Sequence, residues 1–424
     1  MDQRRFTVSS RRRTALAAGS AAVAAALALA GCGGQGFDDS GNDDAEGLTS
    51  SDDALTILYG ASGEAETQAI EAALAAWSEE SGIEATAVAA TNMDQELSQG
   101  FAAGSPPDLF YLAPEKLAGY AANGSLEPYG DLLANKDDFY PGLVQNFTLD
   151  GEFYCAPKDS STLALVINTD LWAEAGLTDA DIPTTWDQLD AAAAALTSGD
   201  TVGLAFGAEY QRVGAFMAGA GGRLVSEDGT TAVADSAENT EALEYVKGHL
   251  EDGTFAYAAD LGAGWGGEAF GKGLAAMTIE GNWITGGLSA DFPDVDYKVV
   301  EMPAGPAGQG TLQFTNCWGM AADSPNQEAA LDLVEYLTSA DQQLAFSEAF
   351  GPMPSVQSAA DTWSTDNPEL AAFLAGADYA TGVPTAAGSA EVIADFNAQL
   401  ESLAAGDPAQ ILATVQGNLE AVVG

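Results

Sequence analysis

Histidine, cysteine and basic residues are scarce in this chain. Its 424 residues include one histidine, three cysteines, and 13 Lys and Arg against 63 Asp and Glu, which gives a formal net charge of −50. A single histidine argues against histidine-based catalysis and against a multi-histidine metal site. So few cations argue against binding to nucleic acid, whose phosphates require a basic surface, and against docking on anionic lipid. We therefore expect no metal, no cofactor and no nucleic-acid partner.

Five of the 13 basic residues lie close together, within residues 4–13, and an Ala-rich apolar run follows from 14 to 30. This order is typical of a secretory signal, and the run is short for a permanent membrane span. Its end, Leu-Ala-Gly-Cys32, resembles the lipobox of bacterial lipoproteins. We interpret residues 1–31 as a lipoprotein signal peptide and Cys32 as the lipidated residue, which anchors the protein at the outer face of the cytoplasmic membrane. Residues 10–13 weakly resemble a twin-arginine signal, so export by Sec and by Tat both remain open.

The segment that begins at Cys32 is polar and acidic. Residues 32–53 have no periodic apolar pattern, which predicts a flexible tether. From Cys32 onward, eight Lys and Arg stand against 62 Asp and Glu, which leaves a formal net charge of −54. A surface of this kind repels its own copies, and we expect a monomer.

After residue 54 the apolar spacing alternates between two periods. Residues 55–59, 109–112 and 163–167 are short runs rich in β-formers. Residues 64–80 and 238–251 instead have apolar side chains at helical spacing. Breaks that contain Gly or Pro separate these segments. Alternating strands and helices predict an α/β fold with helices on both faces of the sheet.

Several motifs follow one another in a characteristic order. They are Pro-Asp-Leu-Phe-Tyr-Leu-Ala-Pro-Glu-Lys at 107–116, Tyr-Cys-Ala-Pro-Lys-Asp at 154–159, Pro-Thr-Thr-Trp at 183–186, Phe-Gly-Lys-Gly-Leu-Ala-Ala-Met at 270–277, Gly-Asn-Trp at 281–283, Trp-Gly-Met at 318–320 and Gly-Pro-Met-Pro at 351–354. Each motif is short, but together they span nearly the whole chain after the tether. In this order the chain resembles bacterial extracellular solute-binding proteins of the maltose and multiple-sugar group, the capture subunits of ABC importers.

The resemblance implies the two-lobe fold of type II periplasmic binding proteins, in which the ligand lies in a cleft between two discontinuous α/β lobes. We expect lobe 1 at residues 54–158 and 308–350, and lobe 2 at residues 159–307 and 351–424. Hinge closure would sequester a sugar or an oligosaccharide. The implied partners are the permease and ATPase subunits of an importer, and this chain has no Gly-x-x-x-x-Gly-Lys-Ser/Thr loop of its own. The resemblance implies a binding protein and not an enzyme.

A sugar requires flat aromatic side chains for its C–H face and polar side chains for its hydroxyls. The resemblance places Trp283 and Trp318 at the cleft, and the glycines around Trp265 predict a loop at the cleft for this residue. The other ligand candidates are Tyr59, Ser62, Asp108, Glu115, Lys116, Ser161 and Glu209, and we expect Tyr210 or Gln211 to share the role of Glu209. Two departures from the family pattern, Leu112 in place of an aromatic and Ser62 in place of an acid, argue against maltose itself.

Two cysteines remain after Cys32. Outside the cell, Cys155 and Cys317 form either a disulfide or a pair of buried thiols. The resemblance places their two segments side by side at the hinge, which implies a disulfide between them.

Two other functions remain open from the sequence. The same fold binds other solutes, such as peptides, and an acidic cleft with aromatic side chains suits a polyamine through charge and cation–π contact. A secreted glycosidase needs two carboxylates about 5–10 Å apart across the scissile bond, and no motif marks such a pair. Cleft aromatics among unpaired carboxylates would favour a polyamine, whereas aromatics that face a neutral ligand would favour a sugar.

Overall fold

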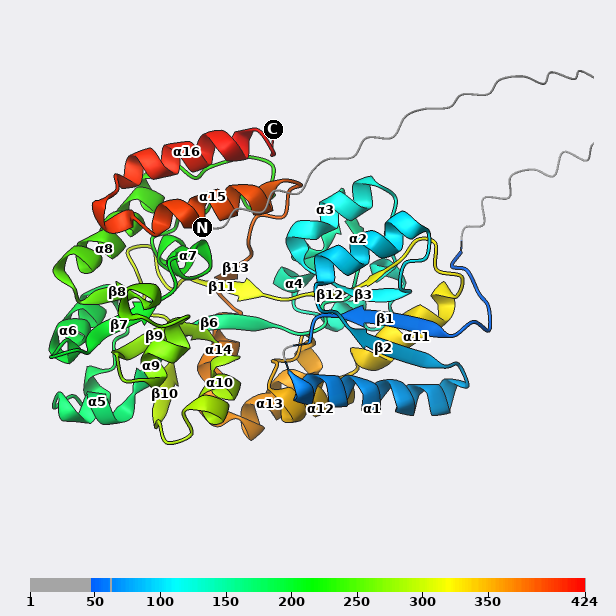
Figure 1. The fold of residues 1–424 in the computed structure, drawn as a ribbon, viewed down its shortest axis with the longest axis horizontal. Coiled ribbons are helices and arrows are strands. Elements are labelled where there is room, and N and C mark those ends of the chain that lie inside the picture. The colour runs from blue at the N-terminus through cyan, green and yellow to red at the C-terminus, as the bar shows by residue number, and fades with distance from the viewer. Residues whose placement is uncertain (1–46, 62, 424) are drawn as a thin grey trace, which may run out of the picture. The chain divides into compact units, whose positions relative to one another are not determined.

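The computed structural model describes residues 47–61 and 63–423, within one compact unit that begins at Gly47 (Figure 1). The expected signal peptide, Cys32, most of the tether and Ser62 lie outside the described residues. The described chain has the predicted α/β architecture. Its strands are β1 (Leu55–Tyr59), β2 (Ala85–Ala89), β3 (Leu109–Leu112), β4 (Thr148–Leu149), β5 (Glu152–Phe153), β6 (Ser161–Asn168), β7 (Val202–Phe206), β8 (Phe255–Tyr257), β9 (Ala275–Gly281), β10 (Tyr297–Val300), β11 (Thr311–Phe314), β12 (Cys317–Met320) and β13 (Ala380–Thr381).

The helices alternate with these strands, as the apolar spacing predicts. They are α1 (Glu64–Ser81), α2 (Met93–Ala103), α3 (Pro114–Ala122), α4 (Pro141–Asn146), α5 (Thr169–Glu174), α6 (Trp186–Leu196), α7 (Tyr210–Gly219), α8 (Ala237–Asp252), α9 (Gly266–Gly271), α10 (Ile284–Asp291), α11 (Gln327–Leu337), α12 (Ala340–Phe350), α13 (Ala360–Asp366), α14 (Ala371–Gly376), α15 (Ser389–Leu400) and α16 (Pro408–Glu420).

Lobe 1 is built on a four-stranded sheet with the order β12-β3-β1-β2. β2 and β3 run parallel to β1, and β12 runs antiparallel to β3. Every residue of β3 is buried, as expected for a strand covered by helices on both faces. α1 contributes Ile70, Leu74 and Trp77 to the same hydrophobic core, and α12 packs against α1. The carboxyl ends of β1 and β3 therefore emerge at one edge of this lobe.

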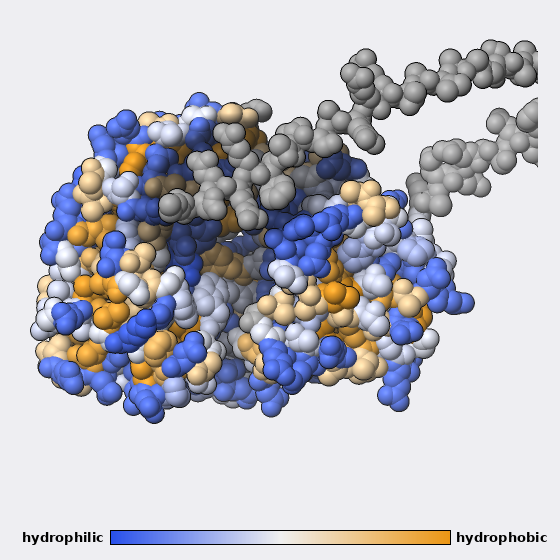
Figure 2. All heavy atoms as spheres, in the orientation of Figure 1, coloured by the Kyte–Doolittle hydropathy of each residue, from blue (hydrophilic) through white to orange (hydrophobic). Residues whose placement is uncertain are grey.

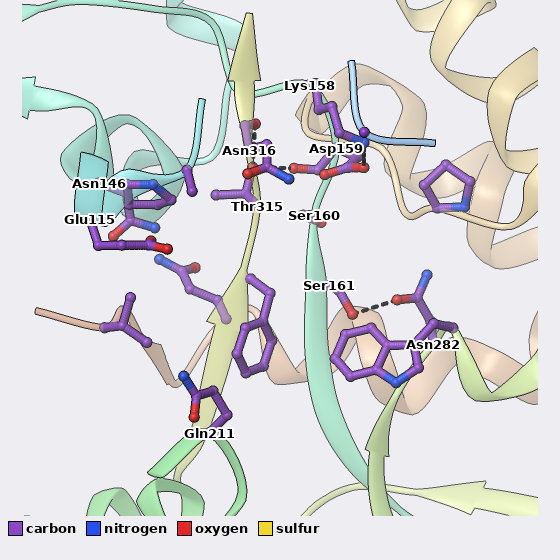
Figure 3. Close-up of a pocket in the computed structure, with 18 of the residues that line it drawn as sticks. Glu115, Asn146, Lys158, Asp159, Ser160, Ser161, Gln211, Asn282, Thr315 and Asn316 are labelled. Carbon is purple, nitrogen blue, oxygen red and sulfur yellow. Dashed lines mark hydrogen bonds and ion pairs between the residues drawn. The ribbon is translucent and has the colours of Figure 1, made fainter. Parts of the chain in front are cut away.

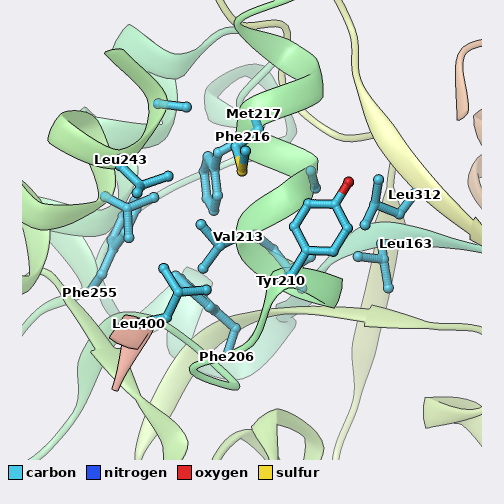
Figure 4. Close-up of a cluster of buried hydrophobic side chains, with 14 of the residues drawn as sticks. Leu163, Phe206, Tyr210, Val213, Phe216, Met217, Leu243, Phe255, Leu312 and Leu400 are labelled. Carbon is cyan, nitrogen blue, oxygen red and sulfur yellow. The ribbon is translucent and has the colours of Figure 1, made fainter. Parts of the chain in front are cut away.

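Lobe 2 is built on a larger sheet with the order β13-β11-β6-β9-β7-β8, and β10 also pairs with β6. β6 is buried along its whole length because β9, β10 and β11 all pair with it. α7 packs Tyr210, Val213 and Phe216 into the core of this lobe, together with Phe206 and Leu312 (Figure 4). Helices α15 and α16 add further buried side chains to the same core.

Three segments connect the lobes: residues 157–160, 315–316 and 351–359. Backbone pairing holds them together, since Pro157 pairs with Cys317 and Ser160 pairs with Met353. Figure 1 shows β6 and β11 running side by side between the two groups of helices. Lobe 1 was predicted to resume at residue 308, but the second crossing lies later, at residues 315–316. The reason is that β11 pairs with β6 and so belongs to the sheet of lobe 2. The third crossing also ends later than predicted, since α13 begins at 360.

The last residues of the predicted tether are bound to lobe 1. The backbone N–H of Thr49 donates to Oε1 of Gln327 over 2.9 Å. The side chain of Asn326 donates to the carbonyl of Asp53, also over 2.9 Å. The folded unit therefore includes residues from Thr49 onward, and a tether predicted to run to residue 53 is too long at its C-terminal end.

Candidate ligand-binding cleft

A cavity of about 570 Å³ lies between the two lobes. From lobe 1 it is lined by residues that follow β1 and β3, and from lobe 2 by residues that follow β9 and by α15. The crossing segments line it as well (Figure 3), and the surface is hollowed between the lobes (Figure 2). Open α/β sheets bind ligands beyond the carboxyl ends of their strands, and small-molecule sites typically enclose about 300–1,000 Å³. Position and size therefore fit a ligand site.

A cluster of charged side chains lies where the first crossing segment lines the cleft. Lys158 and Asp159 form an ion pair there, and Lys158 Nζ lies 3.8 Å from Oε1 of Glu66. The Tyr111 hydroxyl donates to Glu66 over 2.9 Å, and Lys158 Nζ lies 4.5 Å from the centre of the Tyr111 ring. Burial raises the pKa of the Asp159 carboxyl, although Lys158 opposes this effect. The cluster presents an ammonium and carboxylate oxygens, which are donors and acceptors for ligand hydroxyls.

Asn282 links the start of β6 to the third crossing segment. The Ser161 hydroxyl donates to the side-chain carbonyl of Asn282 (Figure 3), and the Asn282 amide donates to the carbonyl of Gly351 over 2.8 Å. Asn282 is 4% exposed and lines the cavity. Because both ends of its amide are already bonded to protein, Asn282 stabilises the wall beside the next residue, Trp283.

Trp283 presents the aromatic surface of the cleft. It lies just after β9 and is 39% exposed, whereas the other described tryptophans are buried or half-buried. Its indole Nε1 donates to Oε2 of Glu280 over 3.0 Å, and its ring meets that of Phe314 edge-on, with 5.6 Å between the centres. Trp283 and Phe314 both line the cavity. A partly exposed indole held in this way can stack on the C–H face of a sugar ring.

Two carboxylates beside Trp283 are paired with one cation. The Arg212 guanidinium contacts Glu209 over 2.8 Å and Glu280 over 2.5 Å. Glu280 is fully buried, and burial raises the pKa of its carboxyl, an effect that Arg212 opposes. Glu209 and Glu280 therefore share Arg212 as their ion-pair partner.

Amide side chains line the cleft in addition to the residues that sequence reasoning selected. Each amide offers both a donor and an acceptor, which suits the hydroxyls of a sugar. They come from α4, α7, β11, the second crossing and α15. Gln211 was expected only as a residue that shares the role of Glu209, and no local motif marks the other four. These amide residues are Asn146, Gln211, Gln313, Asn316 and Asn397, of which Figure 3 labels Asn146, Gln211 and Asn316.

Besides Gln211, three of the predicted ligand residues that the structure describes line the cavity: Glu115, Ser161 and Trp283. Glu115 lies in the first turn of α3, directly after β3, and Ser161 is the first residue of β6. Glu209 does not line it but contacts Arg212.

The predicted aromatics other than Trp283 lie elsewhere. Tyr59 and Trp318 are each 1% exposed in the core of lobe 1, where both meet the Tyr111 ring edge-on. They are buried because they lie within paired strands rather than beyond a strand end. Trp265 packs its ring against Gly267 and Gly287 and joins a hydrophobic cluster of lobe 2.

Two predicted polar residues also lie away from the cavity. Asp108 accepts the backbone N–H of Thr56 over 2.7 Å and the hydroxyl of Ser324 over 2.6 Å, and so fastens the strands of lobe 1 to each other. Lys116 forms an exposed ion pair with Asp94 at 3.0 Å. Both have local partners that account for their charge.

Cys155 and Cys317 form a disulfide. Both residues are buried in the core of lobe 1. The bond joins the first residue of β12 to the strand-like segment that enters the first crossing, so it lies just before residues 158–161 and just after residues 313–316, which line the cavity.

Comparison with known proteins identifies the family. Residues 72–372 match the family model of the bacterial extracellular solute-binding proteins, and the chain belongs to this family. A putative binding protein of Brucella abortus is 25% identical over 348 residues, which are 78% of this chain and 82% of that protein. A diacetylchitobiose binding protein of Streptomyces coelicolor is 24% identical over 356 residues, 77% of this chain and 79% of that protein.

Solved structures confirm the two-lobe fold. The GacH receptor of Streptomyces glaucescens, solved unliganded and with acarbose, aligns with a TM-score of 0.74 and 25% identity over 86% of this chain and 97% of that one. The cyclic α-maltosyl-1,6-maltose binding protein of Arthrobacter globiformis aligns with a TM-score of 0.78 and 22% identity over 87% of this chain and 98% of that one.

Within residues 47–61 and 63–423, no helix combines the length and the apolar character needed to cross a membrane. No group of three or more His, Cys, Asp or Glu side chains in these ranges is arranged to hold a metal ion.

Proposed function

We propose that this protein captures a sugar or an oligosaccharide outside the cell and delivers it to the permease of an ABC importer. The observation that carries this proposal is the position of Trp283: a partly exposed indole in the wall of an interlobe cavity that amides and carboxylates also line. The indole face suits the C–H side of a sugar ring, and the polar groups of the cavity wall suit the hydroxyls of the sugar. The diacetylchitobiose and acarbose named for two similar proteins support the same ligand class.

Capture proceeds by hinge closure and includes no chemical step. The lobes bend about the three crossing segments and enclose the ligand between Glu115 on lobe 1 and Trp283 on lobe 2. We further propose that lipidated Cys32 anchors a monomer at the outer face of the cytoplasmic membrane, after export by Sec or Tat, and that the tether lets the closed receptor reach the permease.

A cationic solute such as a polyamine is the second candidate. Three carboxylates line the cavity, those of Glu66, Glu115 and Asp159, against the single ammonium of Lys158. This excess of negative charge favours a cation at the side of the cleft that carries them. Near Trp283, Arg212 offsets one of the two carboxylate charges, so the excess of negative charge is smaller there and a neutral ligand is favoured at that side.

A thermal-shift screen tests the proposal. Residues 33–424, which omit the signal peptide and the lipidated cysteine, include the whole compact unit. This chain is screened against mono-, di- and oligosaccharides with spermidine and short peptides as controls. A ligand that binds only the folded protein at a hundredfold excess over its Kd adds about 2.7 kcal/mol of stability. We expect a shift with one class of sugar. A shift with spermidine or a peptide and with no sugar would contradict the proposal and retain the fold.

A further inference from the structure

Arg212 is one of only two arginines among the described residues, the other being Arg223. From Cys32 onward the chain has only eight basic side chains to balance 62 acidic ones. Even so, the Arg212 side chain is only 13% exposed, and it contacts Glu209 and Glu280. A guanidinium is costly to bury unless it is paired. Its two partners meet this requirement, so the question is what the buried group does for the cleft.

Arg212 and Glu280 together hold the indole of Trp283. Oε2 of Glu280 accepts the indole N–H over 3.0 Å and contacts the guanidinium over 2.5 Å. The Arg212 Cζ lies over the Trp283 ring, 5.4 Å from its centre, in cation–π geometry. One carboxylate oxygen therefore fixes the edge of the ring and the cation that lies over it.

Gly281 supplies a further constraint on the same ring. A Cβ atom at this position would lie 2.2 Å from the Trp283 ring, closer than real Cβ atoms approach other atoms. The ring therefore lies against the backbone of β9, where only a glycine leaves space for it. Contacts from Arg212, Glu280 and Gly281 all act on the one indole that is open to the cavity.

Arg212 also changes the charge beside the Trp283 ring. Without Arg212, the carboxylates of Glu209 and Glu280 would stand unpaired beside an exposed aromatic ring, which is the arrangement that binds organic cations. With it, both carboxylates are paired and a cation already lies over the ring. A protonated amine that approached Trp283 would meet a like charge over the ring and a net acidic charge of one instead of two.

We propose that Arg212 is a positioning and specificity-determining residue: it holds the Trp283 ring in its stacking orientation, offsets one of the two neighbouring acidic charges and places a cation over the ring, so that this side of the cleft favours an uncharged sugar over a cation. The inference rests on the proposed function, because it assigns Trp283 to ligand stacking. Arg212 itself does not line the cavity and acts through Trp283.

A measurement without ligand tests the positioning effect. Acrylamide quenching of Trp283 is isolated by subtracting the emission of a Trp283→Phe counterpart from that of each variant. We expect Arg212→Gln to make Trp283 more accessible to acrylamide, Arg212→Lys to lie between Arg212→Gln and wild type, and Arg223→Gln, which removes the same charge elsewhere on lobe 2, to match wild type. Equal quenching in Arg212→Gln and Arg223→Gln would overturn the proposal.

Binding measurements with named probes test the specificity effect. The probes are N,N′-diacetylchitobiose and maltotriose as neutral sugars and spermidine as the cation. We expect Arg212→Gln to lower the affinity for the sugar that wild type binds by about tenfold or more, and to bind spermidine more tightly than wild type does. Arg223→Gln should bind the sugar with wild-type affinity. Unchanged spermidine binding in Arg212→Gln would overturn the effect of the Arg212 charge on ligand choice. Wild type that binds no sugar would contradict the proposed function, whereas the quenching comparison would still decide the effect of Arg212 on Trp283.

Arg212→Gln leaves a buried carboxylate without its cation and could prevent folding. The double variant Arg212→Gln/Glu280→Gln removes both buried charges, and Gln keeps the side-chain shape of Glu at position 280. We expect it to fold, to show the same increase in Trp283 accessibility, and to lose sugar affinity. Wild-type quenching together with wild-type sugar affinity in this double variant would overturn the proposal.

Discussion

The end of β9 and the strand β12 each carry a tryptophan close to a glycine, yet the two side chains have opposite environments. Trp283 is 39% exposed and lines the cleft, whereas Trp318 is 1% exposed in the core of lobe 1. β9 ends at Gly281, so Trp283 lies beyond the last paired residue. Trp318 pairs directly with Tyr111 inside the sheet. A tryptophan becomes available to ligand in this fold when it follows the strand, and it becomes core when it lies within the strand.

The largest contrast is expected in stability. Trp318→Ala removes a fully buried ring and should lower the free energy of unfolding by about 3–5 kcal/mol, since it leaves a cavity in the core. Trp283→Ala removes a partly exposed ring and should lower it by about 1 kcal/mol or less. Urea unfolding followed by circular dichroism measures both. Similar losses in the two variants would contradict the assignment of one ring to the core and the other to the cleft.

The disulfide next to Trp318 should have the second-largest effect. Cys155 and Cys317 are 162 residues apart in sequence, so their bond closes a long loop in the unfolded chain. We expect Cys155→Ala/Cys317→Ala to lower the free energy of unfolding by about 2–4 kcal/mol. The same unfolding experiment with and without reductant provides the control, because the double variant must be insensitive to reductant. A variant as stable as the oxidised wild type would contradict this estimate.

Sequence reasoning predicted the α/β alternation, the family, the cysteine pairing and Trp283, because each has a signal that is local or that the order of motifs supplies. It selected Tyr59 and Trp318 wrongly as cleft residues, since a single sequence does not show on which side of a strand end an aromatic lies. It did not select Asn282, although Asn282 lies in the Gly-Asn-Trp motif. It also missed amides such as Asn146 and Asn397, because separate elements bring them together. Which residues line the cleft of a two-lobe fold depends on how the crossing segments bring together side chains that are distant in sequence.

Two glycines sharpen the comparison at a smaller scale. A Cβ at Gly281 would meet the Trp283 ring at 2.2 Å, and a Cβ at Gly319 would meet the Phe110 ring at 2.6 Å. Gly281→Ala and Gly319→Ala should each cost about 1–3 kcal/mol, because each overpacks its site. In a Trp283→Ala background the cost of Gly281→Ala should disappear, while that of Gly319→Ala should remain.

A double-mutant cycle by urea unfolding measures this difference. A cost of Gly281→Ala that persists without the Trp283 ring would show that the glycine serves the backbone of β9 rather than the ring.

The smallest expected effect concerns pH. Burial raises the pKa of Glu280 beside Trp283. A carboxyl whose pKa is higher in the folded than in the unfolded chain lowers stability at pH values above its folded pKa, and this cost disappears as pH falls to the unfolded value of 4.5. Stability should therefore rise on acidification from pH 7 toward pH 4.5. At lower pH it should fall, because hydroxyl and backbone donors hold the pKa of Asp181 and Asp228 below their usual value of 3.8.

Melting temperatures between pH 4.5 and 7 measure this effect, at high salt so that the repulsion within the strongly acidic part from Cys32 onward, formal net charge −54, is screened. Glu280→Gln should show a smaller rise on acidification than wild type. An equal rise in both proteins would contradict the contribution of Glu280.

Calorimetric titration of two matched variants tests the central claim, that one sugar is held between the lobes. Glu115 lines the cavity from lobe 1 and Trp283 lines it from lobe 2, so a ligand enclosed between them needs both. The account predicts that Glu115→Gln and Trp283→Ala each lower the affinity for the same sugar by about tenfold or more. Lys116 lies next to Glu115 in sequence but outside the cavity, so Lys116→Gln should leave the affinity for the sugar unchanged. Full affinity in either cleft variant would contradict capture of the sugar between the two lobes.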